Sequence, residues 1–401
     1  MEPQSIAAFI FIALLTIYFF LNRKKFQVQK IISYLLYFAM YKTKLGLKTM
    51  DSWSRKFPRF FGFLSVTGII VGFLGMALIA YSLIENVVTL LTKPEAVPGV
   101  GIVLPFEVKG AFFVPFFYWI VSIFIIAVIH EFSHGLIARY YNIPLKSSGF
   151  AFLAAIVPII PAAFVEPNEN IMKKRPAKQQ LGVLAAGPFS NIITGFLFFA
   201  MFLFIGIPIV HSVLDFNGVK ITDFSKENSQ TYPAELSGMQ KNEIIREIEN
   251  KPVIYVENFT AILDKKKPGE QLFITTDKAQ YTVTLAYHPN NISRAYLGVI
   301  VSQHTEIKPS FKEKYGTFLA NFLLWFTGTP DQNGLFFWLF LLSFGIGLFN
   351  LVPIGPIDGG RILHVVLLKY FSKEKATKVW MYVGIFFLLL VFVNIGFGFV
   401  R

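Results

Sequence analysis

The sequence predicts a polytopic α-helical membrane protein with one mixed α/β domain outside the bilayer. Of its 401 residues, 54% are hydrophobic and 15% are charged, whereas soluble globular domains carry about 25% charged residues. About six apolar runs have the length of roughly 20 residues that a helix needs to cross the hydrocarbon core. Residues 208–304 instead alternate between apolar and charged residues, with the β-branched residues, Gly and Pro of short strands and turns.

The predicted membrane spans lie at about 5–22, 60–83, 115–135, 181–207, 335–353 and 378–399. Lys and Arg concentrate in the segments after the first, third and fifth spans, whereas residues 85–114 hold only Lys93 and Lys109 among three Glu. By the positive-inside rule, the three basic segments are cytoplasmic and both termini lie outside. The net charge of +13 therefore reflects orientation signals and predicts no nucleic-acid partner.

Residues 208–304 are expected to form the outer domain. Within it, "PAELSGMQKNEIIREIENKPV" (233–253) resembles the PDZ module, in which a short helix and turn precede a strand and a second helix follows. The later "YLGV" (296–299) is similar to the closing strand of that module. The chain departs from the PDZ domains of processing proteases at Asn242, where Gly-Asp is usual, and a generic mixed α/β domain stays an alternative. The chain then divides into N-terminal helices and loops (1–114), the first half of the membrane core (115–207), the outer domain (208–304), and the second half with the C-terminal helix (305–401).

The end of the third predicted span carries the pattern H-E-x-x-H, as His130, Glu131 and His134. Residues i and i+4 share one helix face, so both imidazoles can bind one ion while Glu131 holds a water beside it. Ionisable residues within a span are costly and therefore functional by default. The chain has no Cys, so a metal site must use His, Asp or Glu. The alternative is a pair of satisfied polar residues at a helix end.

A catalytic zinc site needs a third protein ligand, and Asp358 is the candidate. It lies in "PIGPIDGG" (353–360), at the cytoplasmic end of the fifth predicted span, which is the depth that the orientation argument assigns to the two histidines. A helix cap is the alternative role. Capping does not explain why prolines and apolar residues hold a non-helical segment at membrane depth, where such backbone is tolerated only when it is buried or lines a watery cavity.

Taken together, H-E-x-x-H in one span and "NLVPIGPIDGG" (350–360) in a later one closely resemble the site-2 protease family of intramembrane zinc metalloproteases, over residues 115–370. The resemblance implies one Zn²⁺ per chain, with His130, His134 and Asp358 as its ligands and Glu131 as the base that activates the zinc-bound water. It implies a multi-pass cell-membrane enzyme that hydrolyses peptide bonds within transmembrane helices of substrate proteins in the lipid bilayer. The active site would face the cytoplasm, and the PDZ-like domain would be extracytoplasmic.

The fourth predicted span contains a further candidate catalytic residue, Asn191. Gly187, Pro188 and Asn191 match a G-P-x-x-N segment of the family. A tetrahedral oxyanion needs a neutral donor near the metal, and the Asn191 amide is the expected donor. An interhelical hydrogen bond is the alternative role, with similar weight.

Substrate binding is expected on the segment 146–168, which is apolar, interrupted by prolines, and predicted to form a membrane-dipping β-hairpin. The edge of this hairpin would add a strand to an unwound substrate helix, with Gly149 and Phe150 among the contacts. The family resemblance suggests that Asn350 and Pro353 hold the freed substrate backbone.

Three other functions fit parts of the pattern. A second class of membrane H-E-x-x-H protease takes a Glu ligand from a later helix, but no matching helix follows here. A cation or proton-coupled transporter would use His130, Glu131 and Asp358 as a relay, but the internal repeats that such transporters often have are not found. A catalytically inactive PDZ-bearing scaffold would be expected to lack the base, and Glu131 is intact.

Overall fold

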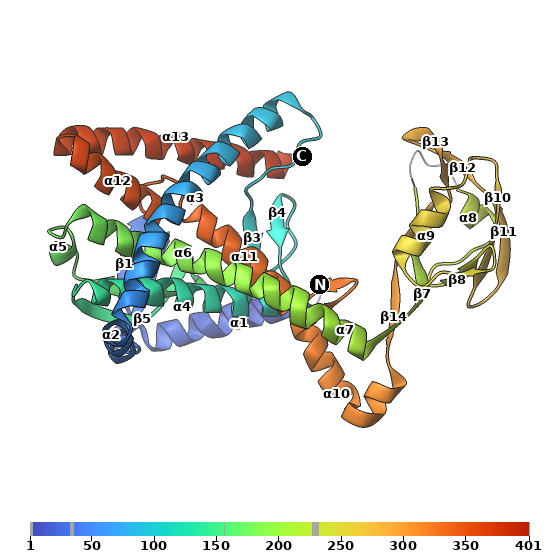
Figure 1. Ribbon diagram of the computed structural model, residues 1–401, viewed down its shortest axis with the longest axis horizontal. Helices are drawn as coiled ribbons and strands as arrows, with labels where there is room; N and C mark the ends of the chain where they lie inside the picture. The colour runs from blue at the N-terminus through green and yellow to red at the C-terminus, as the bar shows by residue number, and fades with distance from the viewer. Residues whose placement is uncertain (1–2, 33–35, 156, 227–231, 401) are drawn as a thin grey trace. The chain divides into compact units, whose positions relative to one another are not determined.

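The computed structural model describes residues 3–32, 36–155, 157–226 and 232–400. The chain separates into two compact units, and each is considered by itself (Figure 1). Unit 1 comprises Met1–Phe199 and Trp338–Arg401, and unit 2 comprises Ala200–Phe337.

Unit 1 is mainly helical. Its helices are α1 (Pro3–Leu21), α2 (Leu47–Lys56), α3 (Pro58–Thr92), α4 (Phe116–Tyr140), α5 (Glu169–Met172), most of α6 (Ala177–Met201) and of α11 (Leu335–Phe349), α12 (Asp358–Tyr370) and α13 (Lys373–Val400), with a 3-10 turn at Arg23–Lys25. Its strands are β1 (Gln27–Ile32), β2 (Leu36–Thr43), β3 (Ile102–Leu104), β4 (Ala111–Phe113), β5 (Leu145–Ala155) and β6 (Val157–Pro167).

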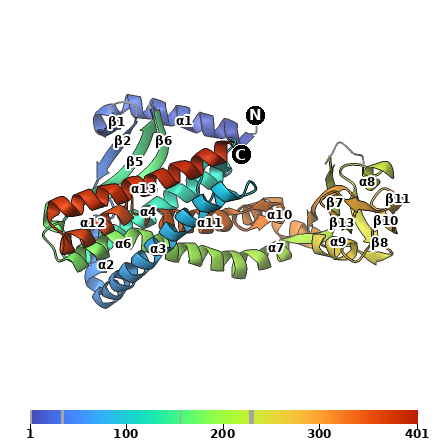
Figure 2. The same ribbon diagram turned by 90° about the horizontal axis from the view of Figure 1, so that it is seen from above.

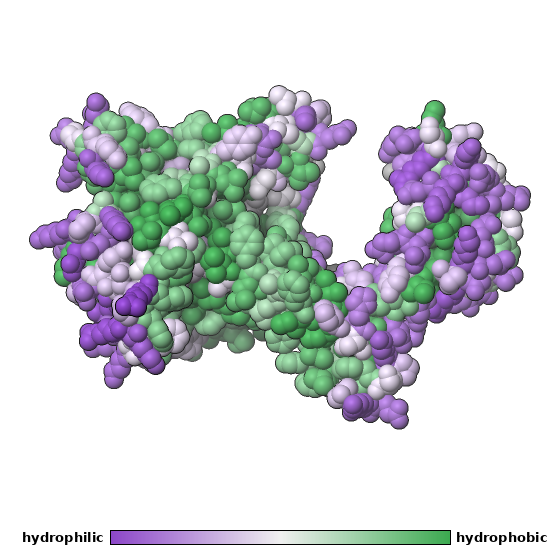
Figure 3. Space-filling model, viewed as in Figure 1, coloured by the Kyte–Doolittle hydropathy of each residue, from purple (hydrophilic) through white to green (hydrophobic). Residues whose placement is uncertain are grey.

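In the part of the chain that the structure describes, four helical segments are long and apolar enough to cross a membrane: Pro58–Thr92, Phe116–Tyr140, Ala177–Val213 and Lys373–Val400. The first and fifth predicted spans correspond to shorter apolar helices, Ile6–Leu21 and Leu335–Phe349. Figure 3 shows hydrophobic residues over the middle of unit 1 and hydrophilic residues at the end that carries α5 and the α12–α13 connection. This distribution is that of a membrane protein.

The helix at the fifth predicted span, α11, ends before the predicted end of that span. Its length affects the depth of the turn that leads to Asp358. Helix α11 has 15 residues. At 1.5 Å per residue it is about 22 Å long, which is less than the ~30 Å hydrocarbon core. The turn at 350–357 therefore follows a helix too short to cross the core.

The predicted hairpin is confirmed as the antiparallel pair β5–β6, except for Ile156 at its tip, which lies outside the described residues. It is half of a four-stranded sheet in the order β1-β2-β5-β6. The basic segment after the first predicted span, where only helices and loops were expected, contributes the strands β1 and β2 as well as α2. Its apolar side chains Tyr37 and Ala39 pack with Phe19 and Phe26, while Lys42 turns outward to Glu166.

The two edge strands of this sheet are β1 and β6, and β6 packs against both α1 and α4 (Figure 2). Strand β5 is interior, since Gly149 pairs with Lys42 on β2 and with Phe164 on β6. A Cβ on Gly149 would lie 2.1 Å from the Tyr41 carbonyl oxygen, so glycine is needed for this close approach. A substrate contact by Gly149 and Phe150 stays a prediction, and the backbone of β5 is already paired on both sides by β2 and β6. The Phe150 ring instead stacks on Phe124 of α4.

The helices of unit 1 pack closely because small residues face each other. A Cβ on Gly195 of α6 would lie 3.1 Å from Phe344, and one on Gly347 of α11 would lie 3.1 Å from the Asn191 side chain. The Ser343 hydroxyl donates to the Asn191 carbonyl at 2.8 Å. Small residues and interhelical hydrogen bonds of this kind stabilise helix pairs in lipid, where the hydrophobic effect between helices is weak.

Unit 2 is built around a six-stranded sheet in the order β11-β10-β8-β7-β14, with β9 paired to β8. Its apolar core includes Val219, Ile245, Phe259, Leu272 and Ile274. Its elements are the π-helical turn Phe202–Gly206, α7 (Ile207–Val213), β7 (Leu214–Phe224), α8 (Pro233–Leu236), β8 (Ile244–Ile248), β9 (Lys251–Pro252), α9 (Val256–Leu263), β10 (Gln271–Thr276), β11 (Gln280–Thr284), β12 (Ala286–His288), β13 (Asn291–Tyr296), β14 (Val299–Ile307), α10 (Pro309–Thr327), β15 (Gly328–Thr329) and β16 (Gln332–Asn333).

The order short helix, strand, helix expected for residues 233–253 and the segment after them corresponds to α8, β8 and α9. The "YLGV" segment is not a strand throughout: Tyr296 ends β13 and Val299 begins β14. Gly298 between them has a φ of +79°, which favours glycine, and a Cβ there would lie 2.1 Å from Tyr232. The sheet occupies residues 214–307, and the predicted domain bounds of 208–304 stay a prediction.

Candidate metal centre

His130, His134 and Asp358 meet in unit 1, and all three are buried. The Nε2 atoms of the two histidines lie 3.1 Å apart. The Asp358 Oδ2 atom lies 3.1 Å from Nε2 of His130 and 3.2 Å from Nε2 of His134. Helix α4 presents the histidines on one face because they are four residues apart, and α12 brings Asp358 from 224 positions further along the chain.

The spacing of these three atoms fits a tetrahedral zinc ion. Zinc–nitrogen and zinc–oxygen bonds are about 2.0–2.1 Å long, so neighbouring ligand atoms in a tetrahedron lie about 3.3 Å apart. The three observed distances are 3.1–3.2 Å. Two imidazoles and one carboxylate also form the donor set of a catalytic zinc site, which leaves the fourth position open. The residues present therefore fit zinc.

Each histidine is oriented by a contact on its other ring nitrogen. His134 Nδ1 donates to the Val183 carbonyl at 2.7 Å, which leaves the Nε2 lone pair for a metal. Nδ1 of His130 lies 3.1 Å from the Asn191 side-chain nitrogen, while Asn191 Oδ1 is buried with no hydrogen-bond partner among the described residues. Turning the Asn191 amide over lets Oδ1 accept the Nδ1 proton of His130, which orients the second imidazole.

Helix α6 passes beside the ligand atoms at Gly187. A Cβ on Gly187 would lie 2.3 Å from Nε2 of His134 and 2.6 Å from Nε2 of His130. Any larger residue would occupy the space into which both lone pairs point. The glycine of the G-P-x-x-N segment is therefore required for an open centre.

The turn before α12 fixes Asp358 through close backbone packing. The Gly359 N–H donates to the Asn350 carbonyl at 2.7 Å. A Cβ on Gly359 would lie 2.3 Å from the Leu351 carbonyl group, and one on Gly360 would lie 2.0 Å from the Ile354 carbonyl oxygen. The two glycines after Asp358 thus allow the turn to fold tightly against the start of the helix.

Glu131, beside the ligand set on α4, is held by the sheet. The Val165 N–H on β6 donates to Glu131 Oε2 at 2.9 Å. Because the other edge of β6 pairs with β5, this N–H belongs to the open edge of the sheet. The open strand edge and the expected base therefore lie side by side.

The remaining predicted residues lie near the centre without joining the ligand set. Asn350 is half-buried at the end of α11, and its side chain makes no hydrogen bond with any residue that the structure describes. Pro353 is buried in the turn before α12. A substrate contact by either residue stays a prediction.

Three contributors at the centre were missed from the sequence: the Val183 carbonyl, the Val165 N–H and the open space at Gly187. The first two are backbone groups, which any residue type supplies, so no sequence signal marks them. Gly187 could have been found, because a glycine in the family segment beside Asn191 suggests a close approach.

Comparison with known proteins shows the family and the relatives to which this chain is similar. The sequence model of peptidase family M50 matches residues 118–391, which include every ligand. An uncharacterised protein of Methanocaldococcus jannaschii, MJ0971, is 27% identical over 357 residues, covering 87% of this chain and 83% of its own. The zinc metalloprotease RasP of Oceanobacillus iheyensis is 24% identical over 56% of this chain and 60% of its own length. RasP of Shouchella clausii is 25% identical over 52% and 57% of the two chains.

Proposed function

The chain belongs to peptidase family M50 and is a metallopeptidase, and on that premise we propose that it cleaves peptide bonds within the transmembrane helices of membrane proteins, using one zinc ion. One observation carries this proposal: the three ligand atoms come from α4 and α12 of a unit whose long helices are apolar enough to cross a bilayer. A site on such helices meets substrate segments that are themselves in the membrane.

The base in this reaction is Glu131. Bound zinc supplies a Lewis acid that polarises the scissile carbonyl and lowers the pKa of a water to about 7. Glu131 removes a proton from the attacking water as its oxygen bonds to the carbonyl carbon, and later delivers that proton to the departing amine. The Val165 N–H at Oε2 restrains the carboxylate and leaves Oε1 for the proton.

The open edge of β6 is the proposed docking strand for the substrate. An unwound helix in lipid leaves backbone groups that cost several kcal/mol each unless they find new partners. Strand addition supplies those partners. Along β6, Ala163 has the same orientation as Val165, because strand residues alternate with a period of two. The unbonded side chain of Asn350 is the proposed second support for the freed backbone.

For Asn191, we favour the positioning role over the oxyanion role. Its amide contacts Nδ1 of His130, the ring nitrogen that faces away from Asp358. A side chain in that position fixes the tautomer and direction of a metal ligand, and such partners are worth about 10–100-fold in metal affinity.

The experiment that tests the function compares Glu131→Gln with wild type. The variant should retain zinc and lose cleavage of a model transmembrane substrate in liposomes, because the base is not a ligand. Residual cleavage near the wild-type rate would remove Glu131 from its role. Cation transport across the liposome membrane that persists in Glu131→Gln, together with no cleavage by wild type, would favour a transporter instead.

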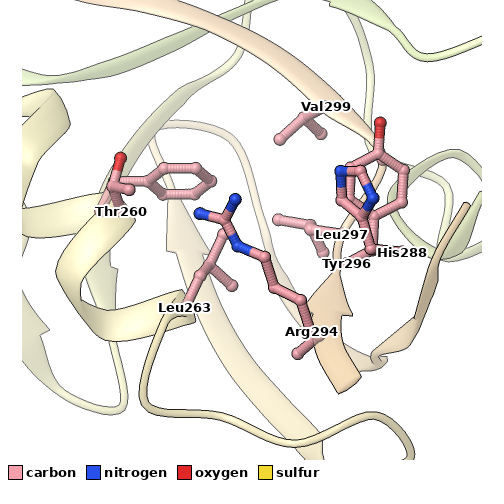
Figure 4. A pocket seen from close by; sticks show the side chains of 10 residues that line it. Thr260, Leu263, His288, Arg294, Tyr296, Leu297 and Val299 are labelled. Carbon is pink, nitrogen blue, oxygen red and sulfur yellow. The ribbon is translucent and has the colours of Figure 1, made fainter. Parts of the chain in front are cut away.

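The PDZ-like part of unit 2 is proposed to control access. A small cavity of about 170 Å³ lies between α9 and the turn that joins β13 to β14 (Figure 4). Thr260 and Leu263 line one wall, and Leu297 and Val299 line another. Such a groove beside a strand start suits an extended peptide. None of the proposed metal ligands belongs to this unit, so it would select substrates and not react with them.

A groove-filling substitution tests this role. Thr260→Trp should change the cleavage of substrates with bulky outer segments and leave cleavage of a minimal helix unchanged. Thr284→Trp, also exposed but on β11 outside the groove, is the matched control. Equal effects of both variants on both substrates would contradict the access role.

We further infer that the metal centre faces the cytoplasm and the sheet of unit 2 lies outside. The chain has no cysteine, so single cysteines report sidedness without background. Lys373→Cys should react with an impermeant thiol reagent from the cytoplasmic side, and Asp277→Cys from the opposite side. Labelling of both from one side would overturn this orientation.

A further inference from the structure

A second cavity in unit 1, away from the metal ligands, has no part in the proposed reaction. It has a volume of about 600 Å³ and lies between α5, the start of α6, α12 and the start of α13. Two kinds of residue line it. Four are cationic, namely Lys173, Arg361, Lys369 and Lys373, and others are apolar, including Met172, Leu184, Val365 and Leu368.

The positively charged residues that line the cavity outnumber the negatively charged ones. Among the lining residues, Glu169 is the carboxylate, and its Oε2 and Oε1 atoms lie 3.1 Å from Lys173 and 3.7 Å from Arg361. The hydrogen bond from Lys173 and the charge of Arg361 hold the pKa of Glu169 below its usual value, so it is ionised. Lys369 and Lys373 form no ion pair with any residue that the structure describes. The cavity therefore has unbalanced positive charge.

Two long helices begin at this cavity. Ala177 is the first residue of α6 and Lys373 is the first residue of α13, and both line the wall. The first turn of a helix has N–H groups without intrahelical acceptors, and the helix dipole makes this end positive. Together with the lysines, these two ends favour an anion such as phosphate.

The apolar residues of the lining indicate which kind of phosphate-bearing molecule fits the cavity. The His364 ring lies 4.9 Å from the Trp380 ring at an angle of 32°, and both line the cavity. Leu368 on α12 also lines the cavity and is 43% exposed. A free phosphate has no apolar part to cover these side chains, whereas a phospholipid presents a phosphate and acyl chains together.

We propose that the cavity between α5, α6, α12 and α13 binds the headgroup of an anionic phospholipid, with its phosphate at Lys369, Lys373 and the two helix starts and its glycerol and upper acyl chain along Val365, Leu368 and Trp380. Basic pockets between membrane helices are known sites for such headgroups. The bound lipid would link α12, which begins with Asp358, to α6, which carries the Val183 carbonyl behind His134. This inference does not depend on proteolysis.

The test uses the full chain in nanodiscs of phosphatidylcholine with a minor fraction of phosphatidylglycerol. After release into detergent, retained lipids are counted by native mass spectrometry. The double variant Lys369→Gln/Lys373→Gln removes two positive charges that line the cavity. The control double variant Lys375→Gln/Lys378→Gln removes two positive charges near the start of α13 that do not line it. Enrichment of phosphatidylglycerol should fall roughly tenfold in the first variant and stay near wild type in the second. Retained zinc in both variants shows that unit 1 is folded.

Each other outcome overturns the proposal. Equal loss of enrichment in both double variants would assign it to general surface charge. Displacement of the lipid by inorganic phosphate at equal concentration would show that the acyl chain adds nothing and that the site takes the free anion. Displacement by a soluble Glu-rich peptide, with the same dependence on Lys369 and Lys373, would make the cavity a contact for acidic protein segments.

Discussion

Both units bury a carboxylate, and the partners of the two groups differ. Glu243 of unit 2 is 1% exposed and accepts hydrogen bonds from the Thr276 hydroxyl at 3.0 Å, the Tyr281 hydroxyl at 3.0 Å and the Gln240 N–H at 3.2 Å. Asp358 of unit 1 is 8% exposed and faces two imidazole nitrogens. Neutral hydrogen-bond donors satisfy the Glu243 carboxylate. The Asp358 carboxylate instead lies beside the lone pairs of two imidazole nitrogens, so a cation is needed to satisfy it.

The comparison shows that burial alone does not make a carboxylate functional. Because three hydrogen-bond donors of unit 2 satisfy it, Glu243 is a structural group. Burial together with the Glu243 carboxylate raises the pKa of the Tyr281 hydroxyl. At Asp358 the lone pairs of three side chains converge, which is the condition for a metal site.

The largest effect is expected for Asp358→Ala. Loss of one of three ligands should reduce zinc affinity by more than the roughly 100-fold upper range of outer-sphere substitutions, and cleavage should disappear. The zinc-to-protein ratio of purified protein measures this. His364→Ala, on the same helix but outside the ligand set, should keep zinc, and full zinc occupancy in Asp358→Ala would remove Asp358 from the site.

Gly187→Ala should be nearly as damaging, although it changes no ligand. Its methyl group would lie 2.3 Å from Nε2 of His134, so either the metal or the packing of α6 must give way. Zinc content and cleavage should both fall to a small fraction of wild type. Gly345→Ala on α11 adds a methyl group with nothing within 4 Å and should match wild type. Normal zinc content in Gly187→Ala would show that the space beside the ligands is not needed.

Asn191 offers a substitution that separates its two candidate roles. Asn191→Leu should weaken zinc binding by about 10–100-fold, because Nδ1 of His130 loses its partner. Asn191→Asp keeps an acceptor for that proton and should keep zinc. If Asn191 instead donates to the oxyanion, both variants keep zinc and both lose turnover, because an ionised Asp donates no hydrogen bond.

The smallest effect on the centre is expected from unit 2. Glu243→Gln should destabilise its sheet by about 1–3 kcal/mol, because the substitution replaces an acceptor oxygen by a buried amide N–H group that finds no acceptor there. Hydrogen exchange of β8 and β10 amides measures this loss. Zinc content should be unchanged, because Glu243 is structural. A fall in zinc content would mean that the two carboxylates are not independent.

Some of the site could be predicted from the sequence because its chemistry is coded by residue type and spacing. Four-residue spacing on a helix puts His130 and His134 on one face whatever surrounds them. The absence of cysteine limits the third ligand to His, Asp or Glu, and a proline-rich apolar turn at membrane depth marks Asp358. The apolar spans follow from the same logic, since length and hydropathy are local properties.

Other features depended on the tertiary structure. The segment around β1 and β2 has the basic residues of a cytoplasmic loop, and its pairing with β5 comes from contacts with residues more than 100 positions away. That pairing makes β5 an interior strand and leaves β6 at an edge of the sheet. No local pattern distinguishes an interior strand from an edge strand of this kind.

Residue type and spacing in the sequence predict His130, His134 and Asp358 as metal ligands and Glu131 as the base. The tertiary structure decided how these groups are oriented: the Val183 carbonyl turns His134, the Val165 N–H restrains Glu131, and Gly187 leaves space at both nitrogens. The physical reason is that ligand chemistry belongs to side chains, which the sequence spells out. Orientation belongs to backbone groups, which are the same in every residue and acquire a role only from their position in space.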